Sequence, residues 1–367
     1  MLNAIKQGID PLEKMVSRIG SELPPLRLAI DFMGFNRPQD RFAAYVEKVR
    51  EVFRRHWPAI HVGELVGSGG FSDVFRATSD YDGVADFAIK ILKPELLNVR
   101  KGRQYVPAEE EMRIKDVKKR FTNESYVQWS LSQSLSPSVA KSVVKVYDHG
   151  EFDSRSRFRF ILMEWMRSTL RAYINDPANF ANTPQQLGYK TALMIKIGAI
   201  IGNVHREGII HRDIKPENIL FTVCPENGPA QGADAADCPE VKLGDFGTVR
   251  WIRSYTSKYD AIIIGSQFYM SPEQVFAPDH IDPRADIYSF GIVCYELLFG
   301  AHPKNISRDT KNLVERLALE PPAPRMPPPD CGPLYDIIMK CMTDRRDRYQ
   351  FMDQVLVEMK DFQGRMR

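Results

Sequence analysis

The chain has 367 residues, of which 43% are hydrophobic and 26% charged, a composition that predicts a globular protein with a sizeable core. Its 50 Lys and Arg against 47 Asp and Glu leave a formal charge of +3, so no overall field favours nucleic acid or a membrane as the main partner. The apolar runs are shorter than the roughly 20 residues of a membrane-spanning helix, and the first residues lack the apolar stretch of a signal peptide.

Cysteine usage favours a reducing compartment. The five cysteines are an odd number without CxxC spacing, which offers no zinc site. Cys224 and Cys238 flank a segment of small residues and could meet across it, but free thiols are the favoured interpretation. We therefore expect a cytoplasmic protein.

Residues 1–57 are expected to form a mostly helical N-terminal extension. After Pro38, apolar side chains recur at three- and four-residue steps, which places one stripe on a helix. The stripe consists of Phe42, Tyr45, Val46, Val49, Val52, Phe53 and Trp57. We expect it to dock on the domain that follows; contact with a partner or a second copy through this helix is the alternative.

Two halves follow the extension. From about residue 60, β-rich runs such as "SDVFRAT", "DFAIKIL" and "RFRFILMEW" alternate with charged turns, and one helix interrupts them near 112–134, as is typical of an antiparallel sheet. Beyond Arg167, "TALMIKIGAIIGNVHREG" and "DIYSFGIVCYELLFG" predict buried helices. The sequence therefore predicts an α+β protein with a small β-rich half over 58–163, a larger helical half over 164–367, and a ligand crevice between them.

The stretch "VGSGGFSDV" (66–74) lies between two predicted strands. Gly67 and Gly69 would let backbone amides approach a phosphate without obstruction by side chains. A plain glycine-rich hairpin is the alternative. A dinucleotide-binding fingerprint is disfavoured, because that pattern opens a helix whereas "DVFRAT" continues as a strand.

Lys90 ends the apolar run "FAIK" and needs an anionic partner, because an isolated buried ammonium is costly. The candidates are the glutamates at 109–111 and Glu124. Glu124 is favoured because it lies within an amphipathic helix, with Phe121 and Val127 on the apolar side. We expect a Lys90–Glu124 pair.

"HRDIKPENIL" (211–220) gathers Asp213, Lys215 and Asn218 on one loop. Together they supply a proton acceptor, a positive charge and a neutral oxygen ligand, which suits an alcohol attacking a phosphoryl group. A charged surface turn is the alternative, but the flanking segments "EGII" and "NILF" are apolar. In "KLGDFGTVR", Asp245 offers a carboxylate for the metal that bridges nucleotide phosphates.

Together and in this order, "GSGGFSDV", "FAIK", "HRDIKPEN", "DFG" and "MSPE" make the chain resemble a eukaryotic-type protein kinase over residues 60–362. The resemblance implies a bilobal protein-kinase fold, with a β-rich N-lobe and a helical C-lobe. It also implies transfer of the γ-phosphate of ATP to protein substrates. "DIKPEN" is similar to the serine/threonine group, and Ser266 falls where that group has a Thr, so serine and threonine are the expected acceptors.

The resemblance also assigns catalytic roles. Asp213 would accept the proton of the substrate hydroxyl, and Lys215 would neutralise the γ-phosphate. Lys90 would hold the α and β phosphates, and Glu124 would pair with Lys90 in the active state.

Cofactor binding follows from the same resemblance. Asn218 and Asp245 would hold Mg²⁺, with Mn²⁺ as a substitute. Met163 falls at the gatekeeper position. The ATP site would comprise Val66, Gly67, Ser68, Gly69, Val74, Ala88, Lys90, Glu164, Met166 and Leu220.

Three further residues resemble structural positions of the family. Asp286 would steady the catalytic loop, and Glu273 would pair with Arg348. Ser72 and Ser271 depart from the usual glycine and alanine of their motifs. The separation of 34 positions between Lys90 and Glu124 reflects an unusually long 93–120 segment, either a solvated loop with a helix extension or a regulatory element.

The residues are compatible with two ways of regulating the activity. Arg212 resembles arginines that organise a phosphorylated loop, and the candidate acceptors are Ser254, Tyr255, Thr256 and Ser257. The apolar "AIII" at 261–264 could instead dock this loop directly.

The 225–240 segment is expected to be a surface excursion. The proline-rich 321–330 segment is expected to be an interhelical loop, with a site for a proline-reading module as the alternative.

Two other functions remain as alternatives to a protein kinase. A pseudokinase or scaffold would lack a member of the catalytic set, and all five residues are present. A small-molecule phosphotransferase of related architecture would usually lack "MSPE" and the aspartate that follows it.

Overall fold

The computed structural model describes residues 38–69, 71–80, 86–93, 108–152, 158–180, 183–223, 239–251, 267–304 and 331–366. These residues belong to two compact units. The first unit extends to Trp129 and includes Lys145–Trp165, and the second consists of Ser130–Val144 and the chain from Met166 onward. Each unit has its own core and is described separately.

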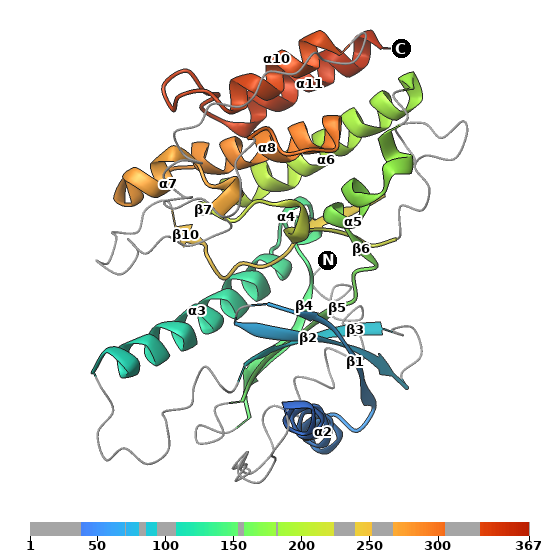
Figure 1. Cartoon of the computed structure of the whole chain (residues 1–367), viewed down its shortest axis with the longest axis vertical. Coiled ribbons are helices and arrows are strands. Elements are labelled where there is room, and N and C mark those ends of the chain that lie inside the picture. The colour runs from blue at the N-terminus through green and yellow to red at the C-terminus, as the bar shows by residue number, and fades with distance from the viewer. Residues whose placement is uncertain are drawn as a thin grey trace, which may run out of the picture. The chain divides into compact units, whose positions relative to one another are not determined.

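The first unit is built on a five-stranded antiparallel sheet with the strand order β1-β2-β3-β5-β4 (Figure 1). Its strands are β1 (Ile60–Ser68), β2 (Ser72–Ser79), β3 (Asp86–Leu92), β4 (Val146–Glu151) and β5 (Arg159–Glu164). Side chains alternate between the two faces of a strand, so each face can be covered by a different helix.

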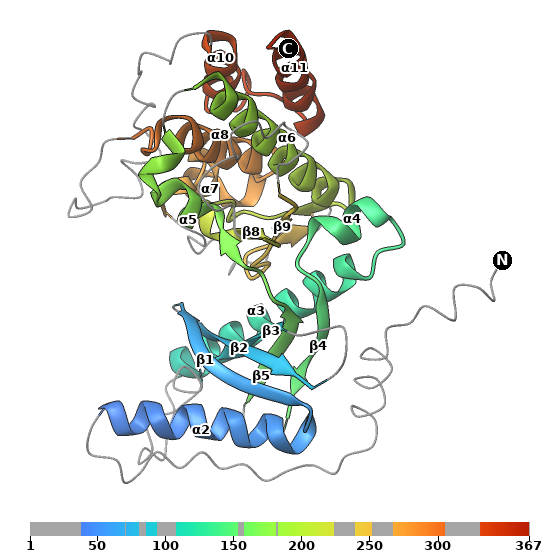
Figure 2. The same ribbon diagram turned by 90° about the vertical axis from the view of Figure 1, so that its right-hand side faces the viewer.

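Helix α2 (Pro38–His56) covers one face of this sheet (Figure 2). The apolar side chains of its inner face pack against strand residues such as Phe75, Phe87 and Ile89. The buried apolar residues described in the helix are Tyr45, Val49, Val52 and Phe53, followed by Trp57 just after the helix. The expected docking of the apolar stripe on the following domain is therefore confirmed.

Helix α3 (Ala108–Ser132) packs on the other face of the sheet. Ile114, Val117 and Phe121 of α3 form a core with Leu92 of β3 and Ile161 of β5. Because Leu92 and Lys90 are two positions apart, they share this face. The position of α3 therefore brings its side chains to the face that carries Lys90.

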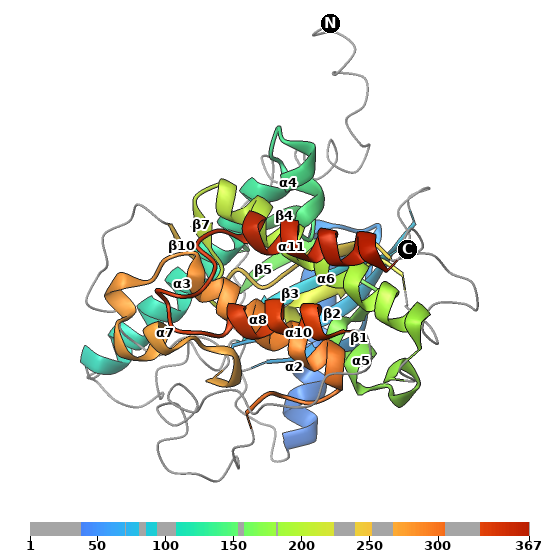
Figure 3. The same ribbon diagram turned by 90° about the horizontal axis from the view of Figure 1, so that it is seen from above.

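The second unit is mostly helical. Its helices are α4 (Pro137–Ser142), α5 (Leu170–Asn175), α6 (Pro184–Arg206), α7 (Pro272–Phe276), α8 (Arg284–Phe299), α10 (Gly332–Cys341) and α11 (Met352–Arg365), with 3₁₀ turns at Pro177–Phe180, Pro216–Asn218, Gln267–Tyr269 and Pro278–His280. Helix α11 packs on α6, and α10 packs on α8 (Figure 3). Helices α6 and α8 are buried along most of their length, as their apolar composition predicts.

Short strands complete the second unit. They are β6 (Ser168–Thr169), β7 (Ile209–Ile210), β8 (Ile219–Phe221), β9 (Val241–Leu243) and β10 (Arg250–Trp251). Strands β6, β8 and β9 form one antiparallel sheet, and β7 pairs with β10. The loop 211–218 therefore begins at β7 and ends at β8, with a strand pair holding each end. The α+β fold class expected from the sequence is confirmed.

Several expectations concern residues outside the described ranges. They are the extension before residue 38, residues 94–107 of the 93–120 segment, most of the 225–240 segment, Cys224 and Cys238, the acceptors at 254–257, the "AIII" segment, Ser266 and the 321–330 segment. Among the described cysteines, Cys294, Cys331 and Cys341 are buried free thiols. None of the described helices combines the length and the apolar character needed to cross a membrane.

Candidate active site

In the first unit, Lys90 and Glu124 form an ion pair between β3 and α3. The Lys90 Nζ atom contacts the Glu124 Oε1 atom, and the two side chains are only 12% and 6% exposed. Burial removes the hydration of both ions, so each buried charge is stable only when the opposite charge lies beside it. Glu124 is thus the partner of Lys90 in the structure, whereas the side chains at 109–111 are outside the described set.

The glycine-rich loop continues from β1, and its backbone is exposed. Gly67 lies opposite Val74 in the sheet, and the Gly69 amide donates to the Ser72 carbonyl at 2.8 Å. Val66, Ser68 and Gly69 are exposed. A Cβ atom added at Gly67 or Gly69 would meet no atom closer than 3.6 Å. A side chain at either position would therefore not clash within the loop, and the glycines leave the space beside the loop open.

A polar connection holds this loop to β2 and β3. The Ser68 hydroxyl donates to Asp73 Oδ1 at 2.7 Å and accepts from Lys93 Nζ at 2.9 Å, and Lys93 lies 3.5 Å from Asp73. The sequence contains the three residues, but their spacing does not indicate that they meet. Their contact depends on the β1-β2-β3 register, which was not predicted.

Three of the nucleotide residues expected in the first unit, Val74, Ala88 and Lys90, share one face of the sheet, whereas Glu164 lies opposite Phe87 on the other face. Val74 lies opposite Lys90, and Ala88 lies opposite Met163 and two positions before Lys90, so these side chains point to the same side. Glu164, at the end of β5, accepts a hydrogen bond from the Lys145 amide at 2.6 Å.

In the second unit, Asp213, Lys215 and Asn218 lie close together. Lys215 Nζ is 2.7 Å from Asp213 Oδ2, and Asn218 Nδ2 lies 3.2 Å from the same oxygen and 2.8 Å from the Asp213 carbonyl. Asp213 and Asn218 are buried, and Lys215 is partly buried. One carboxylate oxygen is therefore held by a cation and an amide.

Asp286 of α8 supports the backbone just before Asp213. Its carboxylate accepts from the amides of His211 and Arg212, each at 2.8 Å, and from His205 Nε2 at 2.8 Å. Burial alone would raise the pKa of Asp286, but the hydrogen bond from His205 and the nearby histidines lower it below its usual value. The expected contact of Asp286 with the loop of Asp213 is confirmed.

Asp245 follows a tightly packed glycine. A Cβ atom on Gly244 would lie 2.7 Å from Leu220 Cδ1, so a larger residue would force the Leu220 side chain to move. The Gly244 amide donates to the Asn218 carbonyl at 3.0 Å, which connects the segment of Asp245 to the loop of Asn218. Asp245 itself has a positive φ of 61°, and the next side chain, Phe246, is fully buried. This strained backbone is held by its surroundings.

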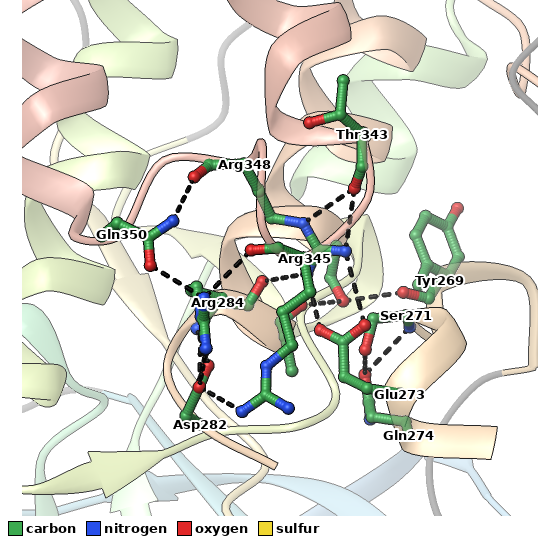
Figure 4. Close-up of polar contacts among 12 residues, drawn as sticks. Tyr269, Ser271, Glu273, Gln274, Asp282, Arg284, Thr343, Arg345, Arg348 and Gln350 are labelled. Carbon is green, nitrogen blue, oxygen red and sulfur yellow. Dashed lines mark hydrogen bonds and ion pairs between the residues drawn. The ribbon is translucent and has the colours of Figure 1, made fainter. Parts of the chain in front are cut away.

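Glu273 and Arg348 form a buried salt bridge at 2.6 Å (Figure 4), which confirms the pairing predicted from the sequence. Arg348 Nη1 also donates to the Arg284 carbonyl at 2.7 Å, and Nη2 donates to the Thr343 carbonyl at 3.1 Å. These bonds attach the start of α7 to α8 and to the loop after α10.

The residues expected to hold Mg²⁺ have suitable donor atoms. The Asn218 amide turns its Nδ2 group toward Asp213, which leaves Oδ1 as the end available to a ligand. Carboxylate and amide oxygens are the ligands that Mg²⁺ prefers. In the described part of the chain, no group of three or more His, Cys, Asp or Glu side chains is arranged to hold a metal.

Two residues at this site were missed by sequence reasoning. The Thr248 hydroxyl donates to the His211 carbonyl at 2.9 Å, and Gln274 Nε2 donates to the Arg212 carbonyl at 2.9 Å. Gln274 follows "SPE" at the third position of α7, a spacing that indicates a helix cap but not a contact with another loop.

Comparison with known proteins identifies the family. The model of the protein kinase domain matches residues 60–355, and the chain therefore belongs to the protein kinase domain family. The resemblance indicated by the five sequence motifs is thereby confirmed.

Curated relatives include bacterial proteins. The chain is 30% identical to the serine/threonine-protein kinase PknL of Mycobacterium tuberculosis over 59% of its own length and 48% of that protein. It is 30% identical to a probable serine/threonine-protein kinase of Clostridium perfringens, over 81% and 37% of the respective chains. For the serine/threonine-protein kinase PrkC of Bacillus subtilis the values are 28%, 81% and 39%. The chain thus spans less than half the length of these relatives.

Proposed function

We propose that the chain is an active protein serine/threonine kinase, which transfers the γ-phosphate of ATP to serine or threonine hydroxyls of protein substrates. The observation that carries this proposal is the contact of Asp213 with both Lys215 and Asn218 on one buried loop. Family membership and the names of the relatives support the same reaction.

In the proposed reaction, Asp213 orients the substrate hydroxyl and accepts its proton as the oxygen attacks the γ-phosphorus, while the bond from the γ-phosphorus to the β-phosphate oxygen breaks and ADP leaves. The ammonium group of Lys215 lies beside Asp213, where the reaction takes place in this proposal. From there Lys215 stabilises the negative charge on the transferred phosphoryl group. Lys90, kept in place by Glu124, would bind the α and β phosphates. Replacing one such electrostatic group typically lowers kcat by about 10²-fold or more.

The proposed nucleotide and metal ligands come from both units. Bound Mg²⁺, or Mn²⁺ in its place, would neutralise phosphate charge, and Asn218 and Asp245 would hold it. The residues proposed to contact ATP are Val66, Gly67, Ser68, Gly69, Val74, Ala88, Lys90 and Glu164 in the first unit and Met166 and Leu220 in the second. The open space around Gly67 and Gly69, where an added Cβ atom would meet no atom closer than 3.6 Å, supports the phosphate-binding part of this assignment.

A transfer assay tests the proposal. Purified chain, labelled ATP, Mg²⁺ and a generic basic protein are incubated beside Asp213→Asn, which keeps the size of the side chain but cannot accept the proton. We expect label on protein from the wild type and a loss of about 10²-fold or more in the variant. ATP binding without any transfer would instead support a pseudokinase, and transfer only to small molecules would support the phosphotransferase alternative.

Other parts of the proposal concern organisation and location. We propose an N-terminal extension over 1–57, an N-lobe over 58–163 and a C-lobe over 164–367. A contact of α2 with a partner or a second copy would have to use exposed side chains such as Glu47, Arg54 and Arg55, because its apolar side is in the core. The buried free thiols support a cytoplasmic location, which cell fractionation can test.

A further inference from the structure

The backbone just before Asp213 has an unusual set of hydrogen bonds. Arg212 has a φ of 66°, a left-handed conformation that is unfavourable for a residue with a side chain. Both peptide groups around it are engaged by side chains from other elements. Asp286 accepts from the His211 and Arg212 amides, Thr248 donates to the His211 carbonyl, and Gln274 donates to the Arg212 carbonyl.

Gln274 also forms hydrogen bonds at the start of α7. Its Oε1 atom accepts from the Ser271 amide at 3.1 Å and from the Ser271 hydroxyl at 3.3 Å, and the two side chains lie together in Figure 4. Ser271 is the residue before the helix and Gln274 is its third residue, so this is the return bond of a capping box. The helix cap and the Arg212 carbonyl are thereby joined by one buried amide.

Chemistry explains why glutamine is needed here. An amide carries an acceptor oxygen and a donor nitrogen on the same carbon, and only one orientation satisfies both Ser271 and the Arg212 carbonyl. A carboxylate could still accept from Ser271 but would place an oxygen against the carbonyl of Arg212. An apolar side chain would leave both partners unsatisfied in a buried setting, where this is most costly.

We propose that Gln274 is a positioning residue for Asp213, which holds the strained Arg212 peptide from helix α7 and thereby sets the direction of the catalytic carboxylate. This inference rests on the proposed function, because it assigns Asp213 to catalysis. Gln274 does not touch the reacting atoms. It acts through the carbonyl that immediately precedes the amide of Asp213 in the same peptide group.

The test compares Gln274→Glu with wild type at about pH 8 and about pH 6. At the higher pH the carboxylate cannot donate to the Arg212 carbonyl, and we expect kcat to fall about tenfold or more with KM for ATP within about twofold. At the lower pH a protonated carboxyl group can donate again, because burial favours its neutral form, so the ratio of variant to wild-type kcat should rise. A merely structural defect would not recover in this way.

Taking the ratio of variant to wild-type kcat at each pH removes the pH dependence that both proteins share, whereas the nearby charged groups set the pKa of the introduced carboxyl group. These groups are Arg212, the Glu273–Arg348 pair and Asp286. A kcat equal to that of wild type at the higher pH, or a loss that is the same at both pH values, would overturn the proposal. If Gln274→Glu does not fold, Gln274→Met replaces it. This variant should lose kcat at both pH values, and wild-type kcat in Gln274→Met would equally overturn the proposal.

Gln354→Glu is the matched control. Gln354 occupies the corresponding position of α11, where its Oε1 accepts from the amides of Gln350 and Phe351 at 2.8 and 3.2 Å, and it is exposed. A carboxylate keeps these bonds, so kcat should stay within about twofold at both pH values.

Hydrogen exchange separates this proposal from the proposed function. In Gln274→Glu at the higher pH, the amides of residues 211–213 should exchange about tenfold faster than in wild type, whereas those of α11 should not change. This readout requires no phosphate transfer. If wild type transfers no phosphate but the variant exchanges these amides faster than wild type, the assigned activity is wrong and the Gln274 contact is real. If wild type is active and the variant has the same exchange rates and the same kcat as wild type, the positioning role is wrong.

Discussion

Asp286 and Asp148 are two aspartates in protected surroundings whose pKa values shift in opposite directions. At Asp286, hydrogen bonds from His205 and two amides outweigh the effect of burial and lower the pKa. At Asp148 on β4, burial raises the pKa to about 6, and the hydrogen bond from the His149 amide offsets only part of the effect. The number of donors around each carboxylate thus decides whether its charge is tolerated.

Asp148→Asn is expected to stabilise the protein above about pH 6 and to have little effect near pH 4. Between the unfolded pKa of about 3.9 and the folded pKa of about 6, the folded state retains a proton that the unfolded state has lost. The free energy of unfolding therefore falls as pH rises through this window. Above it, the variant should avoid a penalty on the order of 2 kcal/mol. Urea unfolding of both proteins at several pH values measures the difference.

Asp347→Asn serves as the control for this comparison. Asp347 is exposed, so the free energy of unfolding should change by less than about 0.5 kcal/mol at any pH. Burial lowers the pKa of the neighbouring His149 in wild type, so the two proteins are compared with each other at each pH. A stabilisation that does not vary with pH would show that the charge of Asp148 is not its cause.

At the scale of elements, α2 is part of the core of the first unit. Phe53 is fully buried, stacks on Trp57 with ring centroids 5.1 Å apart, and meets Phe152 and Phe160 edge to face. His56 and Trp57 each have a buried ring nitrogen without a hydrogen-bond partner among the described residues. The aromatic packing therefore has to outweigh this polar cost.

Phe53→Ala is expected to lower the free energy of unfolding by about 3–5 kcal/mol, because it leaves a cavity between α2 and the sheet. Arg54→Ala at the adjacent exposed position should change it by less than about 0.5 kcal/mol. Urea unfolding followed by tryptophan fluorescence measures both. Equal stabilities for the two variants would mean that α2 does not remain packed on the sheet in solution.

At the scale of the whole molecule, each of the two units has its own core, so we expect that the units can unfold in separate transitions. Three of the four tryptophans, Trp57, Trp129 and Trp165, belong to the first unit, so fluorescence follows mainly that unit. Most helices belong to the second unit and dominate the circular dichroism signal. The two probes can therefore distinguish the stabilities of the two units.

Gly291→Ala is expected to destabilise the second unit. The added Cβ would lie 2.7 Å from Cys341 Cβ and 2.8 Å from Met342 Cγ, an overpacking that costs about 1–3 kcal/mol. The thermal midpoint by circular dichroism should fall more than the midpoint by fluorescence. Gly188→Ala is the control, because its Cβ meets nothing within 4 Å and alanine is favoured in a helix. Equal shifts in both probes would indicate one cooperative unit.

Local patterns were enough to predict much of the site. The loop "HRDIKPEN" places Asp213, Lys215 and Asn218 within six positions, so a single turn can bring them together. The Lys90–Glu124 pair was also predictable, although 34 positions separate its members, because a buried lysine requires an anion and α3 has Glu124 beside its apolar face. The Glu273–Arg348 pair required the family resemblance.

By itself, the sequence determined the class of fold and the family, and it predicted a set of residues for phosphoryl transfer, because these depend on periodicity and on short motifs whose members are near in the chain. The tertiary structure decided which face of the sheet α2 covers, how Ser68, Asp73 and Lys93 meet, and that Gln274 holds the peptide before Asp213. These contacts depend on strand register and on helix docking, which arise from packing across distant segments and leave no local pattern in the sequence.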